Sequence, residues 1–366
     1  MTLFFTECLN LRPITQFVSL DGFLPVVDDS DIVFMDSISL GAPGLQSMGS
    51  AAKIFKYISQ KLDDSESLYF PDGNASVARL LVKKLIPAVT TDSVSFDNIS
   101  TSVFNYEKLD HHEHSVRLRL NSTVVNVKED GNGSVYVNYV KNGEAFRVKS
   151  KHSILACYNS IIPHLCPELP EQQKEAIGYA EKVPFVWVNV HLSNGVAFSK
   201  INAKLIQCPN DPFDVVTVSP PTTTGGYQPP TNSDDPVVLF LMGIPKFQVD
   251  ANDSPRDIYK KGRQIIYTTS FETYEKQIRS QLESLMGNYG FKQSDILAIT
   301  VNRWPHGYAY EYNSLHDPAW KEGEAPHEIG RAQFGRISIA NSDSEASAYV
   351  NAAIDSAWRA VEEQTT

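Results

Sequence analysis

The sequence predicts a mixed fold, α/β plus α+β, in which the chain passes between two domains more than once. Three observations predict it. Residues 115–157 have the pattern of strands and end in the short apolar run "ILACY", which is typical of a strand buried in a parallel sheet. Three more strand-like runs, "VPFVWVNVHL", "FDVVTVS" and "PVVLFLMGI", are separated by Pro-, Thr- and Asn-rich loops. The last residues, "FGRISIANSDSEASAYVNAAIDSAWRAVEEQTT", predict a short strand, a turn and a long helix.

The N-terminal part of the chain is predicted to be mostly loop and helix. Residues 1–60 contain a turn-rich stretch, "SLGAPGLQSMG". Residues 68–89, "LYFPDGNASVARLLVKKLIPAV", predict a turn that leads into a helix. The apolar residues of this helix fall near one face: Val77, Leu80, Leu81 and Leu85.

Strands and helices alternate in the remainder of the chain. In residues 115–157, apolar residues alternate with polar ones from Val116 onwards around an Asp-Gly-Asn-Gly turn, which predicts a hairpin or a meander. Residues 257–287 predict one long helix, and the following "ILAITVNRW" predicts a strand. Residues 336–340 predict the last strand, which a turn carrying Asp343 joins to the final helix.

Composition and charge narrow the classes of function. The 366 residues are 42% hydrophobic and 20% charged, which is typical of a globular protein with a sizeable core. The net charge of −11 and the pI of about 5.3 disfavour nucleic acid as the main partner, because phosphate binding needs clustered Lys and Arg. An acidic surface suits a cationic small molecule.

Cysteine spacing and the start of the chain disfavour further classes. The four cysteines form no CxxC pair and no CxxCH site, so neither structural zinc nor covalently attached haem is expected. The start "MTLFFTECLNLRP" lacks the basic head and the apolar core of a secretory signal, and no apolar run approaches the ~18 residues of a membrane span. The sequence as given predicts a soluble, cytoplasmic chain, although a longer N-terminus could carry a periplasmic signal.

Three segments carry a family resemblance. They are "YFPDGNASVARLLVKKLIP"; "VRLRLNSTVVNVKEDGNGSVYVNYVKNGE" followed by "ILACYNSIIPHLCPELP"; and "RWPHGYAYEYN" with "ISIANSDSEASAYVNAAIDSAWRA". In wording and order they resemble the flavin-containing amine oxidases, and within these the spermidine dehydrogenase-like branch of bacterial polyamine oxidation. The resemblance implies an FAD/NAD(P)-binding, Rossmann-like domain, incomplete at its N-terminus and interleaved with a mixed β-sheet and helical substrate domain.

The resemblance also divides the chain. It implies a helical substrate-domain segment at 1–60, an FAD-domain segment at 61–160, the substrate domain at 161–305 and a C-terminal FAD-domain segment at 306–366.

Four of the residues implied to contact FAD lie outside the last helix. Val124 falls where the family holds the adenine through a backbone N–H and C=O. Asp343 takes the place of a carboxylate that accepts a hydrogen bond from a ribityl hydroxyl. Gly73 and Asn74, in "PDGN", would pass close to the isoalloxazine ring.

Two more such residues, Ala352 and Ala353, lie in the first turns of the last helix. Their small side chains would let the backbone approach the flavin. The positive end of the helix dipole would favour negative charge on the reduced ring.

Four residues are implied to face the substrate. Tyr349 falls where the family places one aromatic of the pair that flanks the substrate amine. Trp304, His306 and Tyr308 would line the opposite wall. Together they would hold the small-molecule amine against the flavin.

The implied reaction needs little acid–base machinery. A polyamine such as spermidine would be deprotonated, placed in a dry pocket and oxidised to an imine, with FAD accepting the hydride. Aromatic rings would also hold the remote cationic amines, at about 0.5–2 kcal/mol each. The branch is described as carrying haem as well, but no residue of this sequence can be assigned as its ligand.

One element of the family is missing from the sequence. A Rossmann-type site needs a strand, a GxGxxG loop, a helix and an acidic residue about 20 positions later. The glycines of "GAPGLQSMG" have a different spacing. We therefore expect the chain to be the C-terminal portion of a longer flavoenzyme, to bind FAD weakly or not at all, and to be inactive unless a separate N-terminal flavin-binding chain supplies the missing part.

Two alternative functions remain open. A flavin-dependent amino-acid oxidase or a carotenoid desaturase shares the scaffold, and Arg303 is the candidate clamp for an amino-acid carboxylate. A non-catalytic fragment or scaffold subunit that pairs with a partner chain belongs to a different class.

Each site residue also has a purely structural interpretation. Val124, Tyr349 and Trp304 suit a hydrophobic core, and Asp343 suits the N-cap of the last helix. "PDGN" is a common turn. The run "DHHEHS", at residues 110–115, is interpreted as a polar surface loop and not as a metal site, since its residues lack helical i,i+4 spacing.

Overall fold

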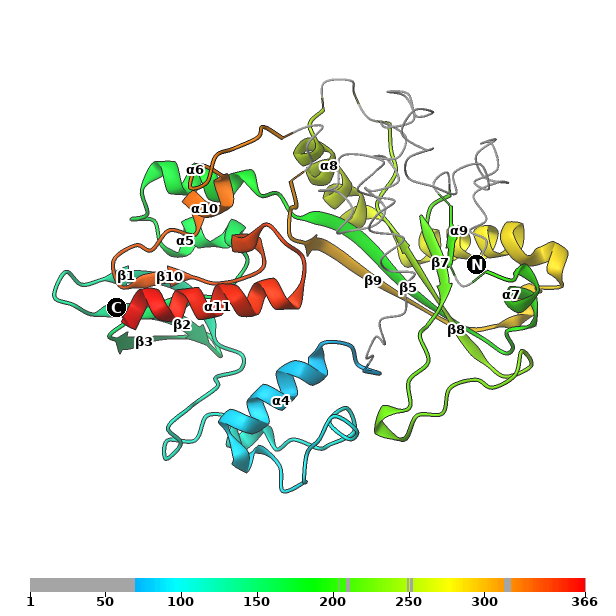
Figure 1. Cartoon of the computed structure of the whole chain (residues 1–366), viewed down its shortest axis with the longest axis horizontal. Helices are drawn as coiled ribbons and strands as arrows, with labels where there is room; N and C mark the ends of the chain where they lie inside the picture. Colours follow the sequence, from blue (N-terminus) through cyan, green and yellow to red (C-terminus); the bar gives the residue numbers. More distant parts are fainter. Residues whose placement is uncertain are drawn as a thin grey trace.

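The computed structural model describes residues 70–203, 205–208, 211–248, 250, 253–312 and 317–365. Figure 1 shows an α/β part that carries the C-terminal helix, a second part built on two long strands, and a smaller part around helix α4. The predictions for residues 1–60 fall outside the described residues.

A five-stranded antiparallel sheet forms the larger part, with the strand order β6-β7-β8-β5-β9. Its two long strands lie side by side in Figure 1. The strands that the apolar runs predict are confirmed, and β9 continues past "ILAITVNRW" as far as Tyr308. The bounds are β5 Val183–Leu192, β6 Leu205–Gln207, β7 Val215–Val218, β8 Val237–Gly243 and β9 Ile296–Tyr308.

Three helices accompany this sheet: α7 (Val196–Ile201), α8 (Pro255–Thr268) and α9 (Phe271–Met286). The prediction of a single helix over 257–287 is wrong. Thr269 is extended, and the Ser270 hydroxyl accepts a hydrogen bond from the Thr273 N–H, which caps a second helix. The core between sheet and helices contains side chains from β5, β8 and α9, among them Val188, Val190, Leu239, Ile278 and Leu282.

The α/β part is built on a parallel pair of strands, β4 (Ser153–Leu155) and β10 (Ile337–Ile339). The predicted parallel strand and the predicted last strand are thereby confirmed, but of β4 only Leu155 is buried and Ile154 is 40% exposed. Four helices belong to this part: α5 Ile162–Leu165, α6 Glu171–Tyr179, α10 Pro326–Gly330 and α11 Val350–Thr365.

The core of the α/β part joins segments that are far apart in the sequence. Val127 and Leu155 pack with Ile177 and with Ile337 and Ile339 of β10. Residues beyond 160 therefore share this core, whereas the domain boundaries at 160 and 305 stay a prediction.

An antiparallel meander precedes β4 in the chain, as the sequence predicts. It consists of β1 (Thr123–Glu129), β2 (Val135–Lys141) and β3 (Glu144–Ser150). The predicted alternation from Val116 to residue 120 does not form a strand. The Arg117 and Arg119 side chains both turn to Asp110, with Nε–O distances of 2.7 and 3.2 Å, and hold this segment in a loop.

The smaller part contains α4 (Ala75–Leu85) and the loops that follow it. Its core contains Ile86, Val89, Ile99, Phe104 and Leu109. The predicted helix is confirmed, but only part of its predicted apolar face is buried against this core. Among the four apolar residues of that face, Leu80 packs against this core, whereas Leu81 and Leu85 are 55% and 57% exposed.

Short 3₁₀ turns complete the described chain: Pro87–Val89, Tyr106–Lys108, Asn159–Ile161, Thr224–Gly226, Gly287–Tyr289, Gln293–Asp295 and Asp343–Glu345.

Candidate active site

The structure brings two predicted site residues of β9, Trp304 and Tyr308, together against one aromatic ring of the neighbouring strand. The register between β5 and β9 shifts in this stretch, between Val183 and Phe185, so the regular alternation of side chains does not place His306 on the same face. Phe185 on β5 lies against both Trp304 and Tyr308. Its ring is stacked on Trp304, with centroids 5.8 Å apart and planes at 9°, and on Tyr308, at 4.7 Å and 23°.

Two more aromatic residues continue this surface across the sheet. The Trp187 ring lies 6.4 Å from Phe185 and 4.0 Å from Phe240 on β8. We call Phe185, Trp187, Phe240, Trp304 and Tyr308 the aromatic face. Sequence analysis missed three of these residues, although the alternation in "VPFVWVNVHL" places Phe185 and Trp187 on one side of a strand.

The candidate carboxylate-clamp residue for an amino-acid substrate lies on the other side of the sheet. Arg303 is adjacent to Trp304 in the strand, so its side chain leaves from the opposite face. Its Nη1 donates to the Thr269 carbonyl at 3.4 Å, between α8 and α9. Arg303 therefore does not share a face with Trp304, and its role as the clamp of an amino-acid carboxylate stays a prediction.

A buried ion pair lies in the turns that follow β4 and β10. The Asp343 side chain is 1% exposed, and its Oδ1 accepts a hydrogen bond from Lys182 Nζ at 2.6 Å. Its Oδ2 accepts from the Asn159 backbone N–H at 3.0 Å. The carboxyl ends of parallel strands are where ligands bind in open α/β sheets, so this end of the pair is the expected place for a site.

Side-chain amides fix these two turns to each other. Asn341 Nδ2 donates to the Cys157 carbonyl at 2.6 Å and to Asn159 Oδ1 at 2.8 Å. The Ser344 N–H donates to Asn341 Oδ1 at 2.8 Å. Asp343 opens this turn and lies well before Val350, where α11 begins, so the interpretation of Asp343 as the N-cap of the last helix is wrong.

Tyr158 connects the ion pair to the aromatic face. Lys182 Nζ lies 4.5 Å from the centre of the Tyr158 ring. The centre of the His306 ring, on β9, lies 6.5 Å from the centre of the Tyr158 ring. Burial lowers the pKa of His306, and the positive charge of Arg263 lowers it further. His306 is therefore a neutral imidazole near pH 7. Burial raises the pKa of Tyr308.

The start of α11 adds the predicted aromatic and the predicted small residues. Tyr349 is 40% exposed, Ala352 is buried, and the Ala353 N–H donates to the Tyr349 carbonyl at 3.3 Å. Glu311 Oε1 accepts from the Ala348 N–H at 2.9 Å, which ties this segment to the residues after β9. The first turn of α11 carries no acidic side chain, so its positive end is not neutralised from within the helix.

The remaining predicted FAD contacts lie on other elements. Val124 is 36% exposed on β1, an edge strand whose outer backbone groups can pair with a ligand. Gly73 adopts a φ of +64° in the turn before α4, and Asn74 occupies the N-cap position without a side-chain cap. Among the described residues, no hydrogen bond or ion pair joins these three to Asp343.

The described residues fit FAD only in part. The edge of β1 and the start of α11, with Ala352 and Ala353, present backbone groups and small side chains, as an adenine and a flavin ring need. Asp343 does not fit a ribityl hydroxyl, because Lys182 and the Asn159 N–H engage its two oxygens and the side chain is closed to solvent.

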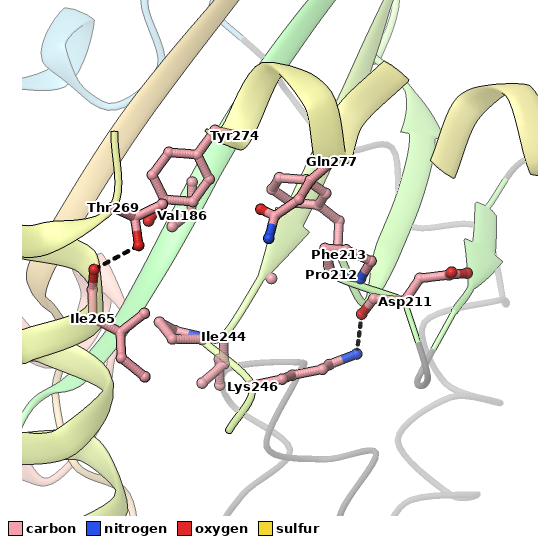
Figure 2. Close-up of a pocket in the computed structure, with 12 residues that line it drawn as sticks. Val186, Asp211, Pro212, Phe213, Ile244, Lys246, Ile265, Thr269, Tyr274 and Gln277 are labelled. Atoms are coloured by element: carbon pink, nitrogen blue, oxygen red, sulfur yellow. Dashed lines mark hydrogen bonds between the residues drawn. The ribbon is translucent and has the colours of Figure 1, made fainter. Parts of the chain in front are cut away.

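A pocket of about 270 Å³ lies elsewhere on the sheet, and Figure 2 shows the residues that line it. Its floor includes Val186, which is opposite Gly243 and on the other side of the sheet from Phe185. Lys246, on its rim, pairs with Asp214 at 2.8 Å. No residue that the sequence predicts as a site residue lines this pocket.

The described residues contain neither a metal-binding cluster nor a membrane-spanning helix. No group of three or more His, Cys, Asp or Glu there could hold a metal ion. None of the helices in that part of the chain has the length and apolar character needed to cross a membrane.

Comparisons with known proteins find similarity to amine oxidase structures. No protein-family model matches the sequence, and no curated protein matches it. Wild-type putrescine oxidase bound to putrescine has a TM-score of 0.47 at 16% identity, over 66% of this chain and 48% of that chain. Cyclohexylamine oxidase from Brevibacterium oxydans IH-35A has a TM-score of 0.47 at 11% identity, over 66% and 47%. The chain spans about half the length of these structures, and scores this low do not establish its family or activity.

Proposed function

We propose that this chain supplies the amine-binding surface of a flavin-dependent amine oxidase. The observation that carries the proposal is the contact of the aromatic face with the turns after β4 and β10, through His306, Tyr158 and Lys182. An amine bound on these rings would lie beside the place where the sequence resemblance puts the flavin. The proposed reaction removes a hydride from the carbon next to the nitrogen and a proton from the nitrogen, giving an imine that water hydrolyses to an aldehyde.

The chain's own residues would bind and deprotonate the amine. FAD, when bound, supplies the acceptor for the hydride. Trp304 and Tyr308 hold the apolar part of the substrate and exclude water from it. His306, neutral at pH 7, accepts the proton that the incoming ammonium must lose. The start of α11 favours negative charge close to it.

Two finer points belong to the proposal. The sequence resemblance names a polyamine such as spermidine as the substrate, and a monoamine fits the same chemistry. The glycine-rich phosphate loop of a flavin site would come from residues outside the given sequence, because this sequence contains no GxGxxG motif. Haem is not part of the proposal, since no ligand for it can be assigned.

The visible spectrum of the purified and desalted chain is the first test. A colourless protein supports the need for residues outside the given sequence, whereas bound flavin in near-stoichiometric amount refutes that need. The oxidase itself is tested by adding amines without oxygen to the FAD-loaded protein and following the loss of flavin absorbance. Loaded protein that no amine reduces would refute the proposed reaction.

A specific surface favours a second candidate function, a subunit that pairs with another chain. Four apolar residues at helical spacing are exposed along α11: Val350, Ile354, Trp358 and Val361. Trp358 is 71% exposed. Large exposed apolar stripes mark interaction surfaces. If the partner is a second copy of this chain, Trp358→Lys should lower self-association in sedimentation experiments without loss of folding, and unchanged sedimentation would count against self-pairing through α11.

A further inference from the structure

The pocket beside Val186 lies on the side of the sheet away from the aromatic face. Its volume of about 270 Å³ is smaller than the roughly 300–1,000 Å³ of sites for drug-sized ligands. Most of its wall is apolar and consists of Val186, Pro212, Phe213, Ile244, Pro245 and Ile265. The pocket therefore suits a small molecule with an apolar body.

Two polar side chains of α9 border the same space. Tyr274 and Gln277 are three residues apart on the helix, so they lie on one face of it, and both line the pocket. Figure 2 shows the Gln277 amide directed into the pocket. Burial raises the pKa of Tyr274, so its hydroxyl keeps its proton near pH 7 and can donate a hydrogen bond. A ligand in the pocket can therefore bond to a hydroxyl and to an amide.

A guanidinium lies at the Tyr274 end of the pocket. Arg303 is directly opposite Val186 in the register of β5 and β9, so the two side chains share a face of the sheet. The Arg303 Nη1 donates to the carbonyl of Thr269, a residue that lines the pocket, at 3.4 Å. Burial is the largest influence on the pKa of Tyr274, and the charge of Arg303 acts in the opposite direction. These observations place a positive charge close to the Tyr274 hydroxyl.

The other end of the pocket carries a cation that is already paired with a carboxylate. Lys246 Nζ lies 2.8 Å from Asp214 Oδ1, and it also donates to the Asp211 carbonyl. Figure 2 shows the Asp211 carboxylate directed away from Ile244. The Arg303 hydrogen bond goes to a neutral carbonyl instead, so the positive potential of the pocket is strongest at the Tyr274 end.

We propose that this pocket binds a small monocarboxylate with an apolar body. The carboxylate accepts hydrogen bonds from Arg303 and from the Tyr274 hydroxyl, and the body packs against the apolar wall. The site is separate from the proposed amine site, because Val186 and Phe185 are adjacent in β5 and leave it on opposite sides. The ligand is therefore not the substrate of the proposed oxidase, and the inference does not rest on that function.

Isothermal titration calorimetry of the full chain tests the proposal with phenylacetate and with its uncharged counterpart, phenylacetamide. We expect phenylacetate to bind at least about tenfold more tightly, because hydrogen bonds to an ionised acceptor are the stronger ones. Arg303→Gln removes the charge and should weaken phenylacetate binding about tenfold, with little change for phenylacetamide. Arg279→Gln is the matched control on α9, where the guanidinium pairs with Glu275 at 2.9 Å, and it should change neither affinity.

Two more variants locate the bound probe. Tyr274→Phe removes one hydroxyl and should weaken phenylacetate binding about fivefold. Trp304→Leu changes the aromatic face and should leave phenylacetate binding unchanged. Circular dichroism of each variant checks that it is folded.

Four outcomes would overturn the proposal. They are a failure of phenylacetate to bind the unchanged protein, equal affinity for the two probes, unchanged phenylacetate binding in folded Arg303→Gln and Tyr274→Phe, and loss of phenylacetate binding in Trp304→Leu. Flavin reduction by amines is a separate measurement, so a failure of the proposed oxidase would leave this result standing.

Discussion

Breaking the Lys182–Asp343 ion pair should destabilise the fold strongly. The two side chains are 3% and 1% exposed, and Nζ lies 2.6 Å from Oδ1. Lys182→Met removes the cation and leaves a buried carboxylate whose remaining recorded partner is the Asn159 N–H. The loss of one partner of a buried pair costs about 3–5 kcal/mol, a large part of the ~5–15 kcal/mol that stabilises a typical domain.

Urea unfolding followed by circular dichroism measures this cost. With an m-value of about 2–3 kcal/mol/M, a loss of 3–5 kcal/mol lowers the midpoint by about 1–2 M. The double variant Lys182→Met/Asp343→Asn removes both charges and keeps an acceptor for the Asn159 N–H. It should therefore lose much less stability than the sum of the two single variants.

An exposed ion pair provides the matched control. Lys128 Nζ lies 2.7 Å from Glu168 Oε1, with side chains 58% and 39% exposed. Lys128→Met should change the free energy of unfolding by less than about 1 kcal/mol, because water screens the pair. The reasoning is refuted if Lys182→Met costs no more than Lys128→Met, or if the double variant is as unstable as the sum of the single variants.

Two further predictions concern the aromatic face. A Cβ on Gly307 would overlap the Phe185 ring, so Gly307→Ala should lower the free energy of unfolding, measured by urea titration, by about 1–3 kcal/mol. Gly178 on α6 has open space around its Cβ position, so the control Gly178→Ala should not lower that free energy and should raise it by up to about 1 kcal/mol. Folding lowers the pKa of His306, so the folded protein binds the proton less readily than the unfolded chain does. The free energy of unfolding is therefore unaffected by this group above about pH 6.5 and decreases as the pH falls below that value. His306→Gln should therefore reduce the loss of stability between pH 7 and pH 5.5, and the exposed His112→Gln should not; equal losses in both variants would contradict the shift.

Local patterns predicted the elements where one face is buried. Runs of apolar residues bounded by Pro-, Thr- and Asn-rich loops predicted β5 and β8, and the apolar "ILACY" predicted a parallel strand whose observed part is Ser153–Leu155. The alternation of side chains along a strand also shows that the adjacent Arg303 and Trp304 leave β9 on opposite sides, so the sequence already separated these two residues. The loop at residues 116–120 could not be predicted from alternation, since its conformation depends on Asp110.

The contacts at the candidate site lie between residues that are distant in sequence. Lys182 and Asp343 are 161 positions apart, and each is unremarkable in its own segment. Asp343 was correctly placed in a turn after the last strand, but its partners decide what it can bind. Because Lys182 and Asn159 engage the carboxylate, a residue type that suits a ribityl hydroxyl stabilises the turn instead.

The position of Lys182 explains how the aromatic face is aligned with the turns after β4 and β10. The chain leaves the α/β part after α6 and enters the sheet at Val183, so Lys182 lies at the first crossing. The second crossing follows β9, where Glu311 accepts the hydrogen bond from Ala348, just before α11. Both crossings are therefore bonded to the segment between β10 and α11. A change at either bond should shift the aromatic face relative to the start of α11, and so alter amine binding without touching an aromatic residue.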